Sequence, residues 1–177
     1  SASSTVLYWN AHSVMDKMHT LSWLVQHLRP TAVCIVESWA DNSIPDGDIS
    51  IEEHGTACRR DRSRRSGGCM THVRNGVSWR EISGGLSTTS SKAGEGVQGS
   101  ISAGAVELHL EGRKPVTVVA AHSPPASAPS MAGISPGGAM INVPRESAPV
   151  LMCWDVNGHN SQWSQGNRDR RGDAVIE

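Results

Sequence analysis

Four short apolar runs, each ending on a polar residue, organise the chain. The runs span residues 5–10, 32–37, 116–122 and 149–155. Apolar runs of this length, bounded by turn signals, predict strands that are buried on both faces. The polar residues at or just beyond their ends are Asn10, Glu37, His122, Asp155 and Asn157. Because polar groups at the carboxyl ends of such strands meet at one edge of an α/β sheet, we expect these five side chains to line a single crevice.

The segment after the first run has the periodicity of an amphipathic helix. Ser13 is a suitable N-cap with Asp16 three residues later, and Pro30 ends the pattern, which predicts a helix over residues 13–29. The apolar positions that share one face are Val14, Met18, Leu21, Val25 and Leu28. A strand, a helix and a strand in succession predict a βαβ unit, which brings Asn10 and Glu37 to the same sheet edge.

The remaining segments carry weaker patterns. Residues 40–58 resemble a loop with a short extended piece at 49–51. Asn75-Gly76 between two extended runs, 69–73 and 77–82, predicts a β-hairpin. A weakly alternating run over 101–110 predicts a further strand. Two stretches rich in Gly, Ser or Pro, 83–100 and 123–148, predict irregular, exposed loops.

Composition and charge change this picture only slightly. A chain of 177 residues is expected to form one domain, and its net charge of −1 gives no global attraction to nucleic acid. The four cysteines lack the spacing of a metal or disulfide framework, which favours a reducing compartment. We find no signal peptide and no apolar stretch long enough for a membrane span. The ends, Ser1 and Glu177, suggest an excised segment.

Five blocks of the sequence, in order, resemble a known family. They are residues 7–10, 34–39, 67–75, 118–125 and 150–160, and the last contains the unit Asp155-Val-Asn157. Together they are similar to the endonuclease/exonuclease/phosphatase superfamily, and more narrowly to the apurinic-type endonuclease domain of LINE-like non-LTR retrotransposons. The resemblance implies an α/β fold of two packed mixed β-sheets flanked by helices, a four-layer, DNase I-like sandwich. We expect residues 1–177 to form a single such domain, truncated at the C-terminus and lacking the final strands.

The resemblance also implies an activity. A member of this family would be an Mg²⁺-dependent (or Mn²⁺-dependent) phosphodiesterase, here a DNA endonuclease that nicks target DNA for retrotransposon insertion. Glu37 and Asp155 would hold the metal, while Asn10, Asn157 and His122 would position phosphate and water. The partners implied are DNA and a parent polyprotein with reverse transcriptase, in the nucleus. The family's later Ser-Asp-His block is not found in this sequence.

Basic residues in two clusters are candidates for contacts with nucleic acid. Arginine binds phosphate through two parallel hydrogen bonds, which makes clusters of arginine suitable for this purpose. The first cluster lies between residues 59 and 65, and the second follows Trp163 in a loop that resembles one of the family's. The candidates are Arg59, Arg60, Arg62, Arg64, Arg65, Trp163, Arg168, Arg170 and Arg171.

Several alternatives remain open on the sequence. Trp154 stands where the family has Gly, the family's terminal block is missing, and the family's helix is eroded in residues 123–148, so the chain could be a catalytically defective remnant that at most binds nucleic acid. His122 stands where the family usually has Tyr, and histidine can donate the same hydrogen bond. A phosphatase of the same superfamily is a further possibility. The five candidate site residues could also be solvated strand ends or turn formers without a function. The arginines between residues 59 and 65 could likewise be part of a solvated loop. A zinc site formed by His54, Cys58, Cys69 and His72 is disfavoured, because Cys69 and His72 would lie on opposite faces of one strand.

Overall fold

The computed structural model describes residues 4–62, 67–82, 102–123 and 149–155. Within these ranges the chain forms eight strands, one α-helix and two 3₁₀ helices. The strands are β1 (Val6–Asn10), β2 (Ala32–Val36), β3 (His54–Arg60), β4 (Cys69–Arg74), β5 (Ser78–Glu81), β6 (Ser102–His109), β7 (Val116–His122) and β8 (Val150–Asp155). The helices are η1 (Met15–Lys17), α1 (Met18–Leu28) and η2 (Asp46–Ile49).

The first sheet has the strand order β1-β2-β4-β3. β1 is parallel to β2, and the other neighbours are antiparallel, so the sheet is mixed. Every residue of β2 is buried. Cys34 on β2 packs into the core between the sheets, whereas Val33 and Ile35 pack on the opposite, helix-covered face. Burial on both faces explains why this strand is a continuous apolar run.

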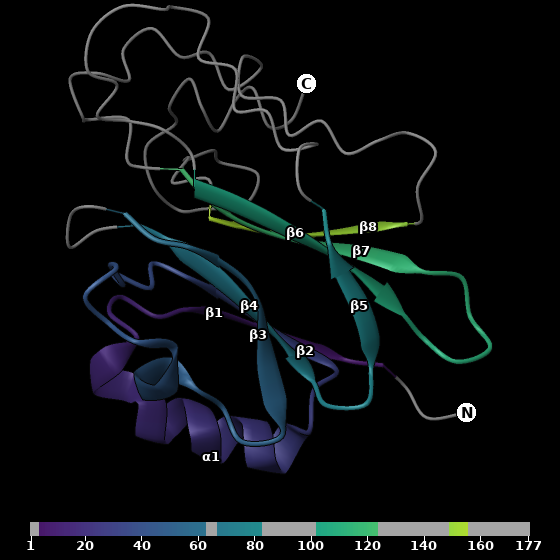
Figure 1. Ribbon diagram of the computed structural model, residues 1–177, viewed down its shortest axis with the longest axis horizontal. Helices are drawn as coiled ribbons and strands as arrows, with labels where there is room; N and C mark the ends of the chain where they lie inside the picture. The colour runs from purple at the N-terminus through teal and green to yellow at the C-terminus, as the bar shows by residue number, and fades with distance from the viewer. Residues whose placement is uncertain (1–3, 63–66, 83–101, 124–148, 156–177) are drawn as a thin grey trace, which may run out of the picture.

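The second sheet has the order β5-β6-β7-β8, with β7 and β8 parallel. The two sheets lie face to face, as Figure 1 shows, and enclose a core from β2, β3, β4, β6, β7 and β8. Helix α1 covers the outer face of the first sheet (Figure 1), where Leu21 and Val25 pack against Val33 and Ile35. The described residues therefore form three layers of the expected sandwich, and the prediction of two packed mixed sheets is confirmed.

The helix expected over residues 13–29 is present but shorter. It begins as η1 at Met15 and continues as α1 to Leu28. Ser13 does not act as the N-cap, because its backbone is left-handed (φ 77°) and its hydroxyl contacts Asp16 instead of a helical N–H. The predicted apolar face holds for Val14, Leu21 and Val25, whereas Leu28 in the last turn is exposed.

The predicted hairpin at Asn75-Gly76 is wrong. A tight turn does form there, with Gly76 at φ 87° and a hydrogen bond from the Val77 N–H to the Arg74 carbonyl (3.1 Å). The strands on either side belong to different sheets, however. β4 is already paired on both edges, with β2 and β3, so β5 crosses over and pairs with β6.

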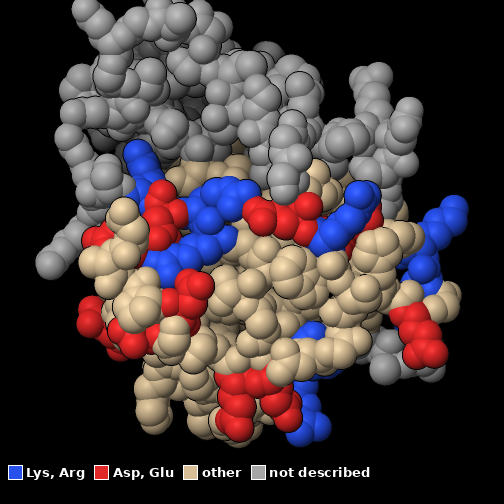
Figure 2. All heavy atoms as spheres, in the orientation of Figure 1, with Lys and Arg blue, Asp and Glu red and all other residues tan. Residues whose placement is uncertain are grey.

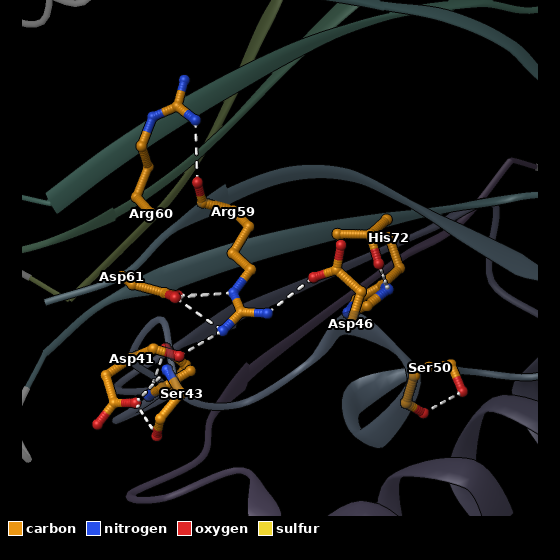
Figure 3. A network of polar contacts seen from close by, with 12 residues as sticks. Asp41, Ser43, Asp46, Ser50, Arg59, Arg60, Asp61 and His72 are labelled. Atoms are coloured by element: carbon orange, nitrogen blue, oxygen red, sulfur yellow. Dashed lines mark hydrogen bonds and ion pairs between the residues drawn. The ribbon is translucent and has the colours of Figure 1, made fainter.

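The loop expected over residues 40–58 is also more ordered than predicted. It contains η2 and the start of β3, while Ile51 forms only an isolated bridge with His54. Arg59 on β3 holds the segment around η2 in place. As Figure 3 shows, its guanidinium binds the carboxylates of Asp46 (2.7 Å) and Asp61 (2.7 Å) and the Asp41 carbonyl (2.8 Å). The predicted irregular stretches 83–100 and 123–148 lie outside the described residues, apart from Ser123.

In the described part of the chain, no helix is long and apolar enough to cross a membrane.

Candidate functional site

Four of the predicted site residues lie at the same end of the two sheets. Asn10 is the last residue of β1, and Glu37 directly follows β2, which runs parallel to it. His122 ends β7 and is paired in register with Asp155, the last residue of β8. The parallel pairs of the two sheets thus bring four strand ends together. The four residues converge as expected, but from the edges of two sheets and not from the one sheet edge that the apolar runs predicted.

Side-chain contacts join these residues across the gap between the sheets. The Asn10 Nδ2 donates to Asp155 Oδ2 at 2.8 Å, and His122 Nε2 contacts Glu37 Oε1. One ligand atom from each of Glu37, His122 and Asp155 lies within 4.8 Å of the other two. The three residues could therefore share one cation.

Glu37 is held by the loop that follows β2 and by the loop that precedes β4. Its Oε2 accepts hydrogen bonds from the Gly67 N–H (2.9 Å) and from the indole N–H of Trp39. Glu37 and Trp39 both have left-handed backbones, and Gly67 has a positive φ (72°) that glycine adopts without strain. Burial raises the pKa of Glu37, but the two hydrogen bonds and the nearby His122 and His12 outweigh it, so the pKa lies below its usual value.

His122 is buried, with 1% of its surface exposed. Burial lowers the pKa of its imidazole, and Arg62 lowers it further, while Glu37 and Asp155 partly offset this. The net direction of the pKa is downward, which favours the neutral imidazole. A neutral imidazole can donate one hydrogen bond and offer the other nitrogen as an acceptor or a metal ligand.

The donor set suits a divalent cation. Carboxylate oxygens are the ligands that Mg²⁺ and Mn²⁺ prefer, and imidazole suits the transition metals. The Asn10 Oδ1 is buried and has no hydrogen-bond partner among the described residues, which leaves another oxygen beside Asp155. Within the described ranges, this is the one such group of potential metal ligands.

The alternative zinc residues are not brought together. His54 contacts the backbone carbonyls of Pro30 and Glu52, and His72 contacts the Thr56 hydroxyl. Cys69 and His72 are an odd number of residues apart on β4 and so point to opposite faces, as predicted.

A pocket of about 440 Å³ lies near His54, at the opposite end of the first sheet from Glu37 and Asn10.

The three described arginines of the first cluster differ in their surroundings. Arg59 and Arg60 bind acidic side chains of the chain itself, Arg60 through Glu81. Arg62 lies at the site, because a Cβ added to Gly67 would come 2.8 Å from the Arg62 Nη1 and 3.0 Å from the His122 Nδ1. On the face of the molecule that Figure 2 draws, basic side chains lie next to acidic ones among the described residues, with no large surface of one sign.

The remaining predicted site residues lie outside the described residues: Asn157, Arg64, Arg65, Trp163, Arg168, Arg170 and Arg171. Sequence reasoning missed two groups that the structure places at the site, the Trp39 indole and the Gly67 N–H. The available signals were a tryptophan two residues beyond Glu37 and the doublet Gly67-Gly68 before a strand.

Comparisons with known proteins give a fold. No model of a known protein family matches the sequence, and no curated protein does. The structure is similar to the "Endonuclease domain of TRAS1, a telomere-specific non-LTR retrotransposon", with a TM-score of 0.61 and 11% identity, over 98% of this chain and 68% of that one. It also matches the AP endonuclease LMAP from Leishmania major (TM-score 0.49, 13% identity, 66% and 39% of the two chains). The catalytic domain of Xenopus laevis APE2 matches as well (TM-score 0.43, 15% identity, 64% and 43%). The chain spans less than half the length of the last two.

The TM-score of 0.61 shows that this chain has the fold of the TRAS1 endonuclease domain, which is the sandwich expected from its resemblance to the endonuclease/exonuclease/phosphatase superfamily.

Proposed function

We propose that the chain is a phosphodiesterase that nicks DNA and depends on a divalent cation, Mg²⁺ or Mn²⁺. The observation that carries this proposal is the convergence of Asn10, Glu37, His122 and Asp155 from four strand ends, with potential ligand atoms of three of them within 4.8 Å. Phosphodiester cleavage needs positive charge near the phosphate and a positioned water, and these residue types can provide both.

Each residue has a distinct role in this proposal. Glu37 and Asp155 hold the cation, which when bound neutralises charge on the scissile phosphate. Asn10 orients Asp155 through the 2.8 Å hydrogen bond and offers its amide oxygen to water. His122 donates a hydrogen bond to a phosphate oxygen, and Asn157 is proposed to act beside it.

The substrate and context are proposed from the fold neighbour. TRAS1 is a non-LTR retrotransposon, and its endonuclease domain shares this fold. We propose that this chain likewise nicks target DNA during insertion, within a polyprotein that carries a reverse transcriptase and acts in the nucleus. We propose that the arginine clusters and Trp163 contact the DNA.

The test of activity is the nicking of supercoiled plasmid. We expect conversion to open circles only when Mg²⁺ or Mn²⁺ is present. Glu37→Gln and Asp155→Asn keep the size of each side chain but remove its charge, and each should slow nicking by at least about a hundredfold, a typical loss for a catalytic group. Glu52→Gln is the matched control, because Glu52 is exposed at the opposite end of the sheet.

Other results would favour the alternatives. A chain that binds DNA but does not nick it would support a remnant that only binds nucleic acid. A chain that releases phosphate from small or lipid phosphates, but leaves plasmid intact, would support a phosphatase. Equal rates for Asp155→Asn and Glu52→Gln would contradict the proposed site.

Arg62 provides a separate test of DNA as the partner. Arg62 lies next to Gly67 and His122, whereas Arg59 is held by Asp46 and Asp61. Arg62→Gln should weaken DNA binding and reduce the slope of log K against log salt by about one, the effect of losing one phosphate contact. Lys114→Gln, in the exposed turn before β7, is the control. Fluorescence anisotropy with a labelled duplex measures both, and an unchanged slope for Arg62→Gln would exclude this contact.

A further inference from the structure

We propose that the site is built for a first-row transition cation, such as Mn²⁺ or Zn²⁺, in preference to Mg²⁺, with the imidazole of His122 as a direct ligand. This inference rests on the proposed function in that the same residues hold the cation. The cation that the site prefers is now named, and His122 is a ligand of that cation instead of a contact for phosphate.

The first argument is the composition of the donor set. The potential ligand atoms are two carboxylate oxygens, from Glu37 and Asp155, and one imidazole nitrogen, all within 4.8 Å of one another. Mg²⁺ is a hard cation that prefers six oxygens and retains several waters. Imidazole is a common ligand of Fe²⁺, Ni²⁺, Cu²⁺ and Zn²⁺, and the affinity of a site for divalent first-row metals is lowest for Mn²⁺ and rises from Mn²⁺ to Cu²⁺. A nitrogen among three donors therefore favours the transition metals.

The second argument is that the imidazole is fixed in place. His122 is buried at the end of β7, and its Nε2 contacts Glu37 Oε1. Gly67 lies next to the ring, because a Cβ added there would lie 3.0 Å from Nδ1. Burial and the contact with Glu37 hold the imidazole beside the carboxylate. Glu37 is in turn held through its other oxygen by the Gly67 N–H at 2.9 Å.

The third argument is the number of donors that the chain supplies. Asp155 is oriented by Asn10, whose Oδ1 is buried and without a hydrogen-bond partner among the described residues. Mg²⁺ usually takes one or two carboxylates from a protein and fills the remaining positions with water and phosphate. Two carboxylates and one imidazole are three donors, which exceeds that number and resembles the mixed nitrogen and oxygen sites of transition metals.

Isothermal titration calorimetry on the metal-free chain tests this preference. Mn²⁺ and Zn²⁺ should each bind at least roughly tenfold more tightly than Mg²⁺. His122→Gln should lose at least about tenfold in affinity for Mn²⁺ and Zn²⁺ and less than about threefold for Mg²⁺. His19→Gln is the matched control, because His19 is exposed on α1. Equal affinities for Mg²⁺ and Mn²⁺, or equal losses for both metals in His122→Gln, would overturn the proposal.

A measurement on the unaltered chain does not depend on whether the variant folds. When Zn²⁺ is added, the imidazole nitrogens of His122 should shift in ¹⁵N NMR spectra at one equivalent, before those of the exposed histidines. If they do not shift, His122 is not a ligand. Both experiments measure metal binding and do not depend on plasmid nicking. A chain that shows the metal preference but does not nick plasmid DNA supports this inference and contradicts the proposed function.

Discussion

At the scale of single residues, the geometry of Glu37 decides what the site can bind. One carboxylate oxygen, Oε2, is occupied by two N–H donors, from Gly67 and Trp39. The other oxygen faces His122. Trp39 is itself positioned by His12, whose ring meets the indole edge-on at 5.6 Å. Trp39 thus acts as a positioning residue, since its indole fixes the orientation of the carboxylate without touching the other candidate ligands.

We predict that Trp39→Phe weakens metal binding. The substitution keeps an aromatic ring but removes the N–H, so the pKa of Glu37 should rise and the carboxylate should lose its fixed orientation. Loss of such an outer partner typically costs about 10-fold to 100-fold in affinity. Calorimetric titration with Mn²⁺ at several pH values measures both effects. Trp79→Phe, on the half-exposed Trp79 of β5, is the control, and equal affinity for the two variants would contradict this role.

At the scale of elements, apolar composition decided which strands could be predicted. β2 and β7 were recognised because they are buried on both faces and are therefore continuous apolar runs. β1 and β8 were also found from their apolar runs, but the prediction that they are buried on both faces was wrong, because both are partly exposed. β3 was missed because its sequence, His54–Arg60, is polar and basic. It is a strand because β4 offers it an edge, and a sequence pattern does not record the availability of a partner.

The same reasoning applies to the site. The meeting of Asn10 with Glu37 and of His122 with Asp155 could be predicted, since the ends of neighbouring parallel strands lie side by side. The meeting of the two pairs depends on how the two sheets pack. The contributions of Trp39 and Gly67 could not be predicted, because they depend on the conformations of two loops that are far apart in the sequence. The hydrogen bond from Gly67 to Glu37 spans 30 residues. The crossing of β5 to the second sheet was missed because Asn-Gly predicts a local turn but does not specify which strand the chain pairs with next.

We predict that Gly104→Ala destabilises the packing of the two sheets. A Cβ at Gly104 on β6 would lie 2.3 Å from the Cys58 Sγ on β3, so the strands must separate or Cys58 must move. Overpacking of a core of this kind costs about 1–3 kcal/mol. Chemical denaturation measures the loss in the free energy of unfolding. Gly55→Ala is the control, because a Cβ there meets no atom within 4 Å. The further replacement Cys58→Ala should restore part of the loss, and a lack of rescue would contradict this contact.

At the scale of the whole molecule, burial of ionisable groups makes stability depend on pH. His72 is fully buried in the first sheet, and burial, with a smaller effect of His54, lowers its pKa to about 4. The pKa values of His122 and Glu37 are also lowered. For all three groups the unfolded chain binds protons more readily than the folded chain. Acid therefore favours unfolding.

We predict that the chain loses stability as the pH falls from about 6.5 to 4. In this range the unfolded state protonates His72 while the folded state does not, which costs up to about 1.4 kcal/mol per pH unit. His122 adds to the loss below pH 6.5, and Glu37 adds to it as the pH falls below 4.5. Urea denaturation at pH 7, 6 and 5 measures the change. His72→Gln should flatten the dependence, and a profile equally steep without His72 would contradict this assignment.

The hydrogen bond between Asn10 and Asp155 joins residues that are 145 positions apart in the chain. Contacts with such separation form late in folding, because the entropy of closing a long loop is lost before the contact can stabilise it. The βαβ unit can form locally, and with it Glu37, but Asp155 reaches Glu37 only after β8 has joined β7 and the two sheets have packed together. Affinity for a cation should therefore appear only at the end of folding. A partly folded chain, in which Asp155 has not yet reached Glu37, should not bind the metal.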